Sequence, residues 1–77
     1  MKEKTEKLVI TFPTTTMAMK MDSLSTPDQG RLIPLPGEIS AGCGLSWSTD
    51  PTQEEDLLKF MEENSIEWEG TFHVALY

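Results

Sequence analysis

The feature that most constrains the fold is the order in which two kinds of hydrophobic spacing follow one another. Apolar residues cluster or alternate in four short segments, 7–12, 31–36, 44–48 and 66–77, a pattern typical of β-strands. In residues 14–25 and 50–64 they recur every three to four residues, which indicates amphipathic helices. The sequence therefore predicts the order strand, helix, strand, strand, helix, strand.

This order predicts an α+β fold of the ferredoxin-like βαββαβ type, a two-layer sandwich with both helices on one face of a four-stranded sheet. We expect the first and third strands to lie parallel in the centre, with the fourth and second at the edges. Pro34 and Pro36 lack an amide hydrogen, which suits the edge position of the second strand. We expect residues 1–77 to form a single domain.

The last strand and the second helix carry the most detailed signals. Asp50 is expected to cap the second helix, with Pro51 at its first position and Gln53 completing a capping box. From the alternation in the last strand, we expect Phe72 to face the helices and His73, the only histidine, to face away from them. Gly70 within this strand allows a β-bulge.

Charge and cysteine content exclude several classes of protein. The net charge is −7, from 13 acidic and six basic residues, which argues against a nucleic-acid partner because phosphate binding needs clustered Lys and Arg. One cysteine cannot form an internal disulfide. The apolar run Leu8–Phe12 is too short for a signal peptide or a membrane span. We therefore expect a cytoplasmic protein that does not enter a membrane.

The single cysteine, Cys43, lies between Gly42 and Gly44. Glycine has no Cβ, so backbone amides on both sides could turn toward the sulfur and steady an anion there. Ser40 could contribute a further amide, and Lys7 a positive charge. The same letters also fit a buried structural cysteine at the start of a strand, so a reactive and a structural Cys43 both stay open at this point.

The expected topology also places Cys43. If the third strand starts at the end of the sheet where the first begins, Cys43 lies near Lys7 and near the approach to Tyr77. Both helices would finish at that end, and their carbonyl termini would disfavour a thiolate, which leaves the glycine-flanked amides or Lys7, Lys4 and Lys2 to stabilise it. For reactivity we expect the sulfur to be at least partly exposed.

Three segments resemble the selenium/sulfur carrier protein-like family, which consists of small bacterial domains. They are Leu-Val-Ile-Thr-Phe at 8–12 with the helix that follows, Arg-Leu-Ile-Pro-Leu-Pro at 31–36, and Ile-Ser-Ala-Gly-Cys-Gly-Leu at 39–45. The resemblance implies a carrier rather than a stand-alone enzyme. Cys43 would accept sulfur or selenium from a donor protein as a persulfide or perselenide and pass it to an acceptor protein, without a cofactor.

Two other readings compete with a carrier. A non-catalytic interaction module would use the open sheet face, with His73 and Tyr77, and the acidic second helix to bind a protein or a second copy in a homodimer. A metal site built on Cys43 and His73 has only two ligands and needs a dimer to complete four. We therefore expect no metal in the single chain.

Overall fold

The computed structural model describes residues 5–37, 39 and 42–76. The predictions that involve Lys2, Lys4, Ser40 and Tyr77 lie outside these residues. The elements follow the predicted order, with two additional short 3₁₀ turns: β1 (Thr5–Thr11), α1 (Thr15–Leu24), a 3₁₀ turn (Pro27–Gln29), β2 (Arg31–Pro34), β3 (Leu45–Thr49), a 3₁₀ turn (Pro51–Gln53), α2 (Glu54–Glu63) and β4 (Gly70–Leu76).

The four strands form one sheet in the order β2-β3-β1-β4, and every neighbouring pair is antiparallel. The predicted edge position of the proline-containing strand is confirmed. The predicted parallel pairing of the first and third strands is wrong. A right-handed crossover makes β1 and β2 parallel, and β3 returns beside β2 in the opposite direction, so it must also run opposite to β1.

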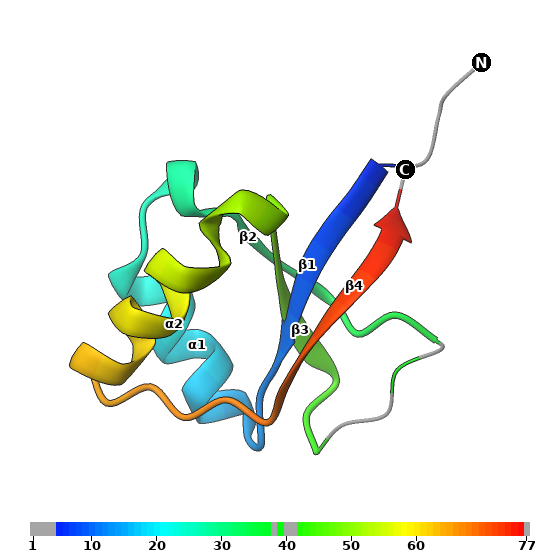
Figure 1. Ribbon diagram of the computed structural model, residues 1–77. Coiled ribbons are helices and arrows are strands. Elements are labelled where there is room, and N and C mark those ends of the chain that lie inside the picture. The colour runs from blue at the N-terminus through cyan, green and yellow to red at the C-terminus, as the bar shows by residue number, and fades with distance from the viewer. Residues whose placement is uncertain (1–4, 38, 40–41, 77) are drawn as a thin grey trace.

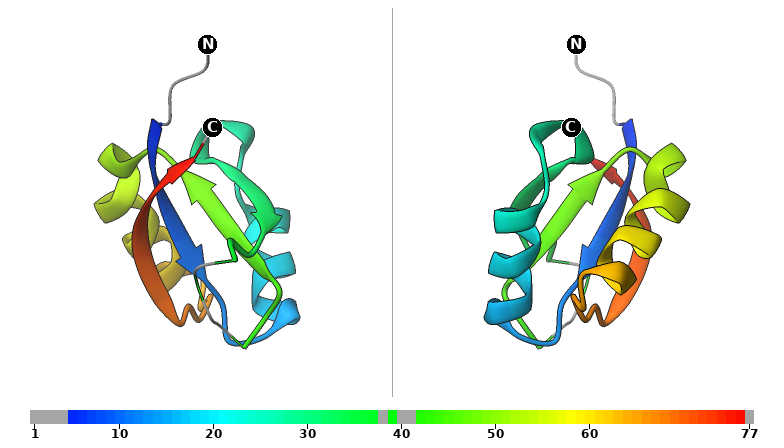
Figure 2. Two further views of the ribbon diagram at one scale, coloured as in Figure 1. Left: turned by 90° about the vertical axis from the view of Figure 1, so that its right-hand side faces the viewer. Right: turned by 90° about the vertical axis from the view of Figure 1, so that its left-hand side faces the viewer.

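The hydrophobic core lies between the sheet and the helices. In Figure 1 both helices lie to the left of the sheet, and the connection between β2 and β3 lies to its right; Figure 2 shows the same layers from either side. This α+β arrangement is consistent with a ferredoxin-like fold. The core contains the following buried residues: Leu8, Ile10, Phe12, Ala18, Met21, Cys43, Trp47, Leu57, Met61 and Ile66.

The central strand β1 is buried on both faces. Val9 and Thr11 alternate with the core residues of β1 and so point to the other face, yet both are fully buried. Ser46, which pairs with Thr11, and Ile39 in the connection between β2 and β3 are buried as well. The connection lies on the side of the sheet opposite the helices (Figure 1), the side to which Val9 and Thr11 point.

The second helix starts through a 3₁₀ turn rather than directly. The Asp50 carboxylate accepts hydrogen bonds from the backbone N–H of Thr52 at 2.9 Å and from its hydroxyl at 2.7 Å, which confirms Asp50 as a cap. These bonds hold the pKa of Asp50 below its ordinary value. The predicted capping box is wrong, because the side-chain amide of Gln53 donates instead to the Asp28 carbonyl at 3.1 Å.

The end of α2 is a Schellman motif, in which two backbone bonds close the last turn. The N–H of Ile66 donates to the Met61 carbonyl at 2.8 Å, and the N–H of Ser65 donates to the Glu62 carbonyl at 3.3 Å. Ser65 has a φ of 57°, the left-handed conformation that this motif requires and that glycine adopts most easily. The chain turns here toward β4.

The faces of β4 are the reverse of the prediction. Gly70 pairs with Thr11 and the register continues one to one along the strand, so the described strand has no bulge. His73 pairs with Leu8, a core residue, and therefore faces the helices. Phe72 faces away from them and is 39% exposed. The prediction failed because the strand starts at Gly70 and its faces follow the register with β1, not the alternation counted from residue 66.

Candidate functional site

Cys43 lies where β1 ends, not where it begins. Thr11, the last residue of β1, pairs with Ser46 near the start of β3, so the residues just before β3 lie beside the end of β1. Lys7 is at the opposite end of the same strand pair, where β3 finishes. The predicted proximity of Cys43 to Lys7 is therefore wrong, and it fails because it assumed that β1 and β3 are parallel.

The sulfur of Cys43 is buried, with 4% of the residue exposed, and it belongs to the hydrophobic core. The expected partial exposure is wrong. Two polar groups nevertheless surround Sγ. The backbone N–H of Leu45 donates to Sγ at 3.3 Å, and the Thr15 hydroxyl lies 3.5 Å from it. Cys43 thus lies inside the core with hydrogen-bonding groups directed at its sulfur.

The backbone of Gly42, next to Cys43, packs closely against the residues at the end of β1. A Cβ on Gly42 would lie 2.7 Å from the Pro13 carbonyl oxygen, closer than real Cβ atoms come. The N–H of Gly42 donates to the Glu69 carboxylate at 3.1 Å. The chain is therefore held between the residues that follow β1 and those that precede β4. Gly44 has no atom near its missing Cβ, so its lack of a side chain serves no close contact.

The first helix begins, rather than ends, next to the sulfur. Thr15 is the first residue of α1, and the Thr14 side chain caps the helix by accepting the N–H of Met17 at 3.3 Å. Because β1 leads directly into α1, the amino end of α1 and Cys43 meet at the end of β1. The expectation that both helices finish there is wrong for α1. A helix amino end carries partial positive charge, so it favours negative charge on nearby atoms.

Sequence reasoning missed three residues at this site: Thr15, which contacts Sγ of Cys43, and Pro13 and Glu69, which contact Gly42. Their positions could have been predicted from the order of the strands and helices. Antiparallel pairing of β1 with both neighbours places the residues after β1, before β3 and before β4 at one end of the sheet. Of the predicted site residues, the structure brings Gly42, Cys43 and Gly44 to this end, leaves Lys7 away from it, and does not describe Ser40.

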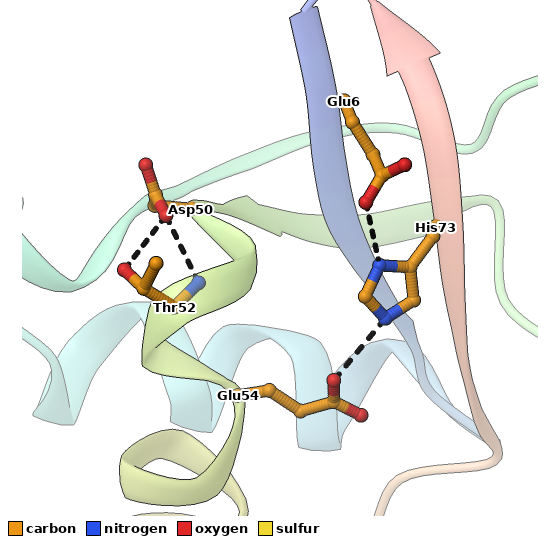
Figure 3. A network of polar contacts seen from close by, with 5 residues as sticks. All are labelled: Glu6, Asp50, Thr52, Glu54 and His73. Carbon is orange, nitrogen blue, oxygen red and sulfur yellow. Dashed lines mark hydrogen bonds and ion pairs between the residues drawn. The ribbon is translucent and has the colours of Figure 1, made fainter.

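A second polar cluster lies on the helix-facing side of β4. Nδ1 of His73 is 3.0 Å from the Glu6 carboxylate and Nε2 is 3.1 Å from the Glu54 carboxylate, so the ring links β1, β4 and the start of α2 (Figure 3). Both carboxylates raise the pKa of His73 above 6.5. His73 pairs with Leu8 in mid-strand, which separates it from Cys43.

Within the described ranges, no group of three or more His, Cys, Asp or Glu side chains is placed to hold a metal ion. Neither α1 nor α2 has the length and apolar content that crossing a bilayer requires.

A family model described as "Putative Se/S carrier protein-like" matches residues 7–73. The chain belongs to this family. The resemblance found in the sequence is therefore confirmed. Comparisons with curated proteins and with solved structures give no significant match.

In this Se/S carrier-like protein, the matched range contains the whole neighbourhood of Cys43. It includes Pro13, Thr15 and Glu69 as well as the glycines that flank the cysteine. The one cysteine of the chain lies in this range.

Proposed function

We propose that this protein carries sulfur or selenium on Cys43 as a persulfide or perselenide. The observation that carries the proposal is the placement of the Leu45 N–H and the Thr15 hydroxyl at 3.3 and 3.5 Å from Sγ. The Leu45 N–H donates to Sγ, the Thr15 hydroxyl can donate to it once Cys43 is a thiolate, and the amino end of α1 favours negative charge on Sγ and on the outer atom of a persulfide or perselenide. Membership of the Se/S carrier-like family supports the same assignment.

The loading step is a thiol exchange that needs no added oxidant. The Cys43 thiolate attacks the outer sulfur of a donor persulfide, a bond forms between the two sulfurs, and the S–S bond of the donor breaks. The donor leaves as a thiolate and takes up a proton. Transfer to an acceptor protein is the same exchange with the carried sulfur as the atom attacked. The partners are accordingly a donor and an acceptor protein, and a reducing compartment such as the cytoplasm keeps the empty carrier as a thiol.

Burial of the sulfur sets a requirement for this exchange. With only 4% of Cys43 exposed, a donor reaches Sγ after the Gly42–Gly44 backbone has moved away from Pro13 and Thr15. Among the described residues, two hydrogen bonds and one close approach hold this backbone: the Gly42 N–H donates to Glu69, the Gly44 carbonyl accepts the Leu35 N–H at 2.9 Å, and Gly42 packs against the Pro13 carbonyl. Local opening of so small a segment costs less free energy than unfolding of the domain.

Intact-mass measurement tests the proposal. The protein is incubated with glutathione persulfide as the donor, and Cys43→Ser is treated in parallel after its fold has been verified by circular dichroism. We expect the wild-type chain to gain one sulfur atom, which dithiothreitol removes, and the variant to gain none. The proposal fails if wild-type protein stays unmodified under conditions in which the urea-unfolded chain is modified.

The burial of Cys43 also favours a second candidate, a non-catalytic interaction module, because a core cysteine is often only a packing residue. In that case Cys43→Ser leaves partner binding intact, whereas charge reversal at Glu62 and Glu63 weakens it. The two candidates share the proposed fold, a ferredoxin-like βαββαβ sandwich with both helices on one face of the sheet. A homodimer belongs to the second candidate.

A further inference from the structure

A groove lies between the end of α2 with the turn that follows it and Pro13, two residues after β1. It has a volume of about 460 Å³, enough for one or two apolar side chains. Pro13 forms one wall, and Ile66 and Trp68 form another. Ile66 is buried beneath its surface, while Trp68 is half-buried and so presents part of its ring to the groove.

The rim of this groove is acidic. Glu62, in the last turn of α2, and Glu67 both line it and are exposed. One base lies close by, since Nζ of Lys20 donates to the Ser65 carbonyl at 3.2 Å. The surroundings are acidic as well, because the stretch 50–69 contains eight acids and one base and the chain carries a net charge of −7. An apolar groove with this rim fits a partner that presents an apolar side chain between basic residues.

We propose that this groove binds a segment of the donor or acceptor protein that carries a Leu, Met or Phe flanked by Lys or Arg. The apolar side chain fills the space between Pro13 and Trp68, and the flanking cations lie against Glu62 and Glu67. Depletion of charge at the centre and a charged rim are usual for protein interfaces. The long-range attraction between an acidic carrier and a basic partner also speeds their encounter.

The position of the groove links it to Cys43, and in this respect the inference rests on the proposed function. Trp68 immediately precedes Glu69, whose carboxylate accepts the Gly42 N–H, and Pro13 contributes the carbonyl against which Gly42 packs. A partner in the groove therefore touches the two segments that hold the cysteine backbone. It also brings its own reacting group to the end of the sheet where Sγ lies.

Titration of the full-length protein with a synthetic peptide tests the groove. The probe is a short peptide with one central Leu between lysines. Two matched peptides replace the Leu by Ser or the lysines by Glu. Binding is measured by calorimetry at low salt. The protein variants are Trp68→Ala and the pair Glu62→Lys with Glu67→Lys. Glu55→Lys, an exposed acid in the first turn of α2, is the control.

We expect the Leu and Lys peptide to bind, and each groove variant to weaken binding at least about tenfold, the change that 1.4 kcal/mol produces. The control is expected to change it less than about twofold. Equal binding of the Ser peptide, equal loss of binding in Glu55→Lys, or no binding at all would overturn the inference. A dimer in sedimentation that fills the groove with a second copy of the chain would overturn it as well. Loading of Cys43 from glutathione persulfide does not use the groove, so failure of either proposal is visible without the other.

Discussion

Among single residues, Cys43 combines burial with polar contacts. Its sulfur is in the core, yet a backbone N–H and a hydroxyl reach it from two elements, Leu45 of β3 and Thr15 of α1. A cysteine that only filled space would need neither contact. The two contacts tie the start of β3 to the start of α1, so they contribute to stability as well as to the chemistry that we propose.

Replacing Thr15 by Val tests the hydroxyl contact, because the two side chains have nearly the same shape. We expect the free energy of unfolding to fall by about 1 kcal/mol or less, the value of a typical neutral hydrogen bond, when measured by urea denaturation. Thr16→Val, at the neighbouring exposed position, is the matched control and should cost less. Equal effects of the two variants would show that the contact of the Thr15 hydroxyl with Sγ contributes nothing to the free energy of unfolding.

His73 makes stability depend on pH in a direction that its contacts fix. Glu6 and Glu54 raise the pKa of His73 in the folded chain above 6.5. A raised pKa means that the folded state holds the proton more tightly than the unfolded state does. The stabilisation is therefore fully present below pH 6.5 and is lost as the pH rises through the folded-state pKa.

Replacing His73 by Gln should remove this pH dependence. For wild-type protein we expect the urea midpoint to fall as the pH rises from about 6 to about 8, and for His73→Gln we expect a flatter profile over the same range. Lys59→Gln changes an exposed residue of α2 and leaves the contacts of His73 with Glu6 and Glu54 in place, so it should keep the wild-type slope. A slope in His73→Gln equal to that of the wild type would refute the assignment.

Among the elements, the segment before β3 depends on one glycine for its close contact with the end of β1. Gly42→Ala places a methyl group 2.7 Å from the Pro13 carbonyl oxygen, and such overlap costs about 1–3 kcal/mol. The strain is relieved when the segment opens. We therefore expect the alkylation rate of Cys43 by iodoacetamide to rise about tenfold or more. Gly44→Ala meets no atom within 4 Å and should leave the rate unchanged; a rise of equal size in both variants would contradict this account.

The last turn of α2 offers a second pair of matched substitutions. Ser65 adopts a φ of 57°, which costs an L-residue roughly 1 kcal/mol, so Ser65→Gly should raise the free energy of unfolding by up to about that amount. Ser23→Gly, at an exposed position inside α1, should lower it by about 0.5–1 kcal/mol. If both substitutions shift the urea midpoint in the same direction, the left-handed φ of Ser65 does not determine the effect of Ser65→Gly.

The sequence predicted the elements better than their directions. Caps and apolar spacing are local, and they placed α1, the Asp50 cap and the proline-containing edge strand correctly. The faces of β4 depend on its register with β1, which no local pattern contains. The surroundings of Cys43 depend on the relative direction of β1 and β3. Because β1 and β3 were predicted to be parallel, Cys43 was predicted at the wrong end of the sheet, and its proximity to Pro13, Thr15 and Glu69 was not predicted.

For the whole molecule, the account joins an acidic surface, a groove and a buried thiol at one end of the sheet. We propose that the surface attracts basic partners, that the groove orients them, and that the thiol carries the transferred atom. The central claim of the proposed function is that the sulfur becomes accessible while the domain stays folded. A cysteine that is only a core residue would become accessible when the domain unfolds.

The alkylation rate of Cys43 measured across urea concentrations below the unfolding transition tests this claim most directly. We predict a rate that changes little with urea, because opening of the Gly42–Gly44 backbone exposes little surface. A rate whose logarithm rises with the same urea slope as global unfolding, and which extrapolates to the free energy of global unfolding in water, would show that the sulfur is reached only in the unfolded chain.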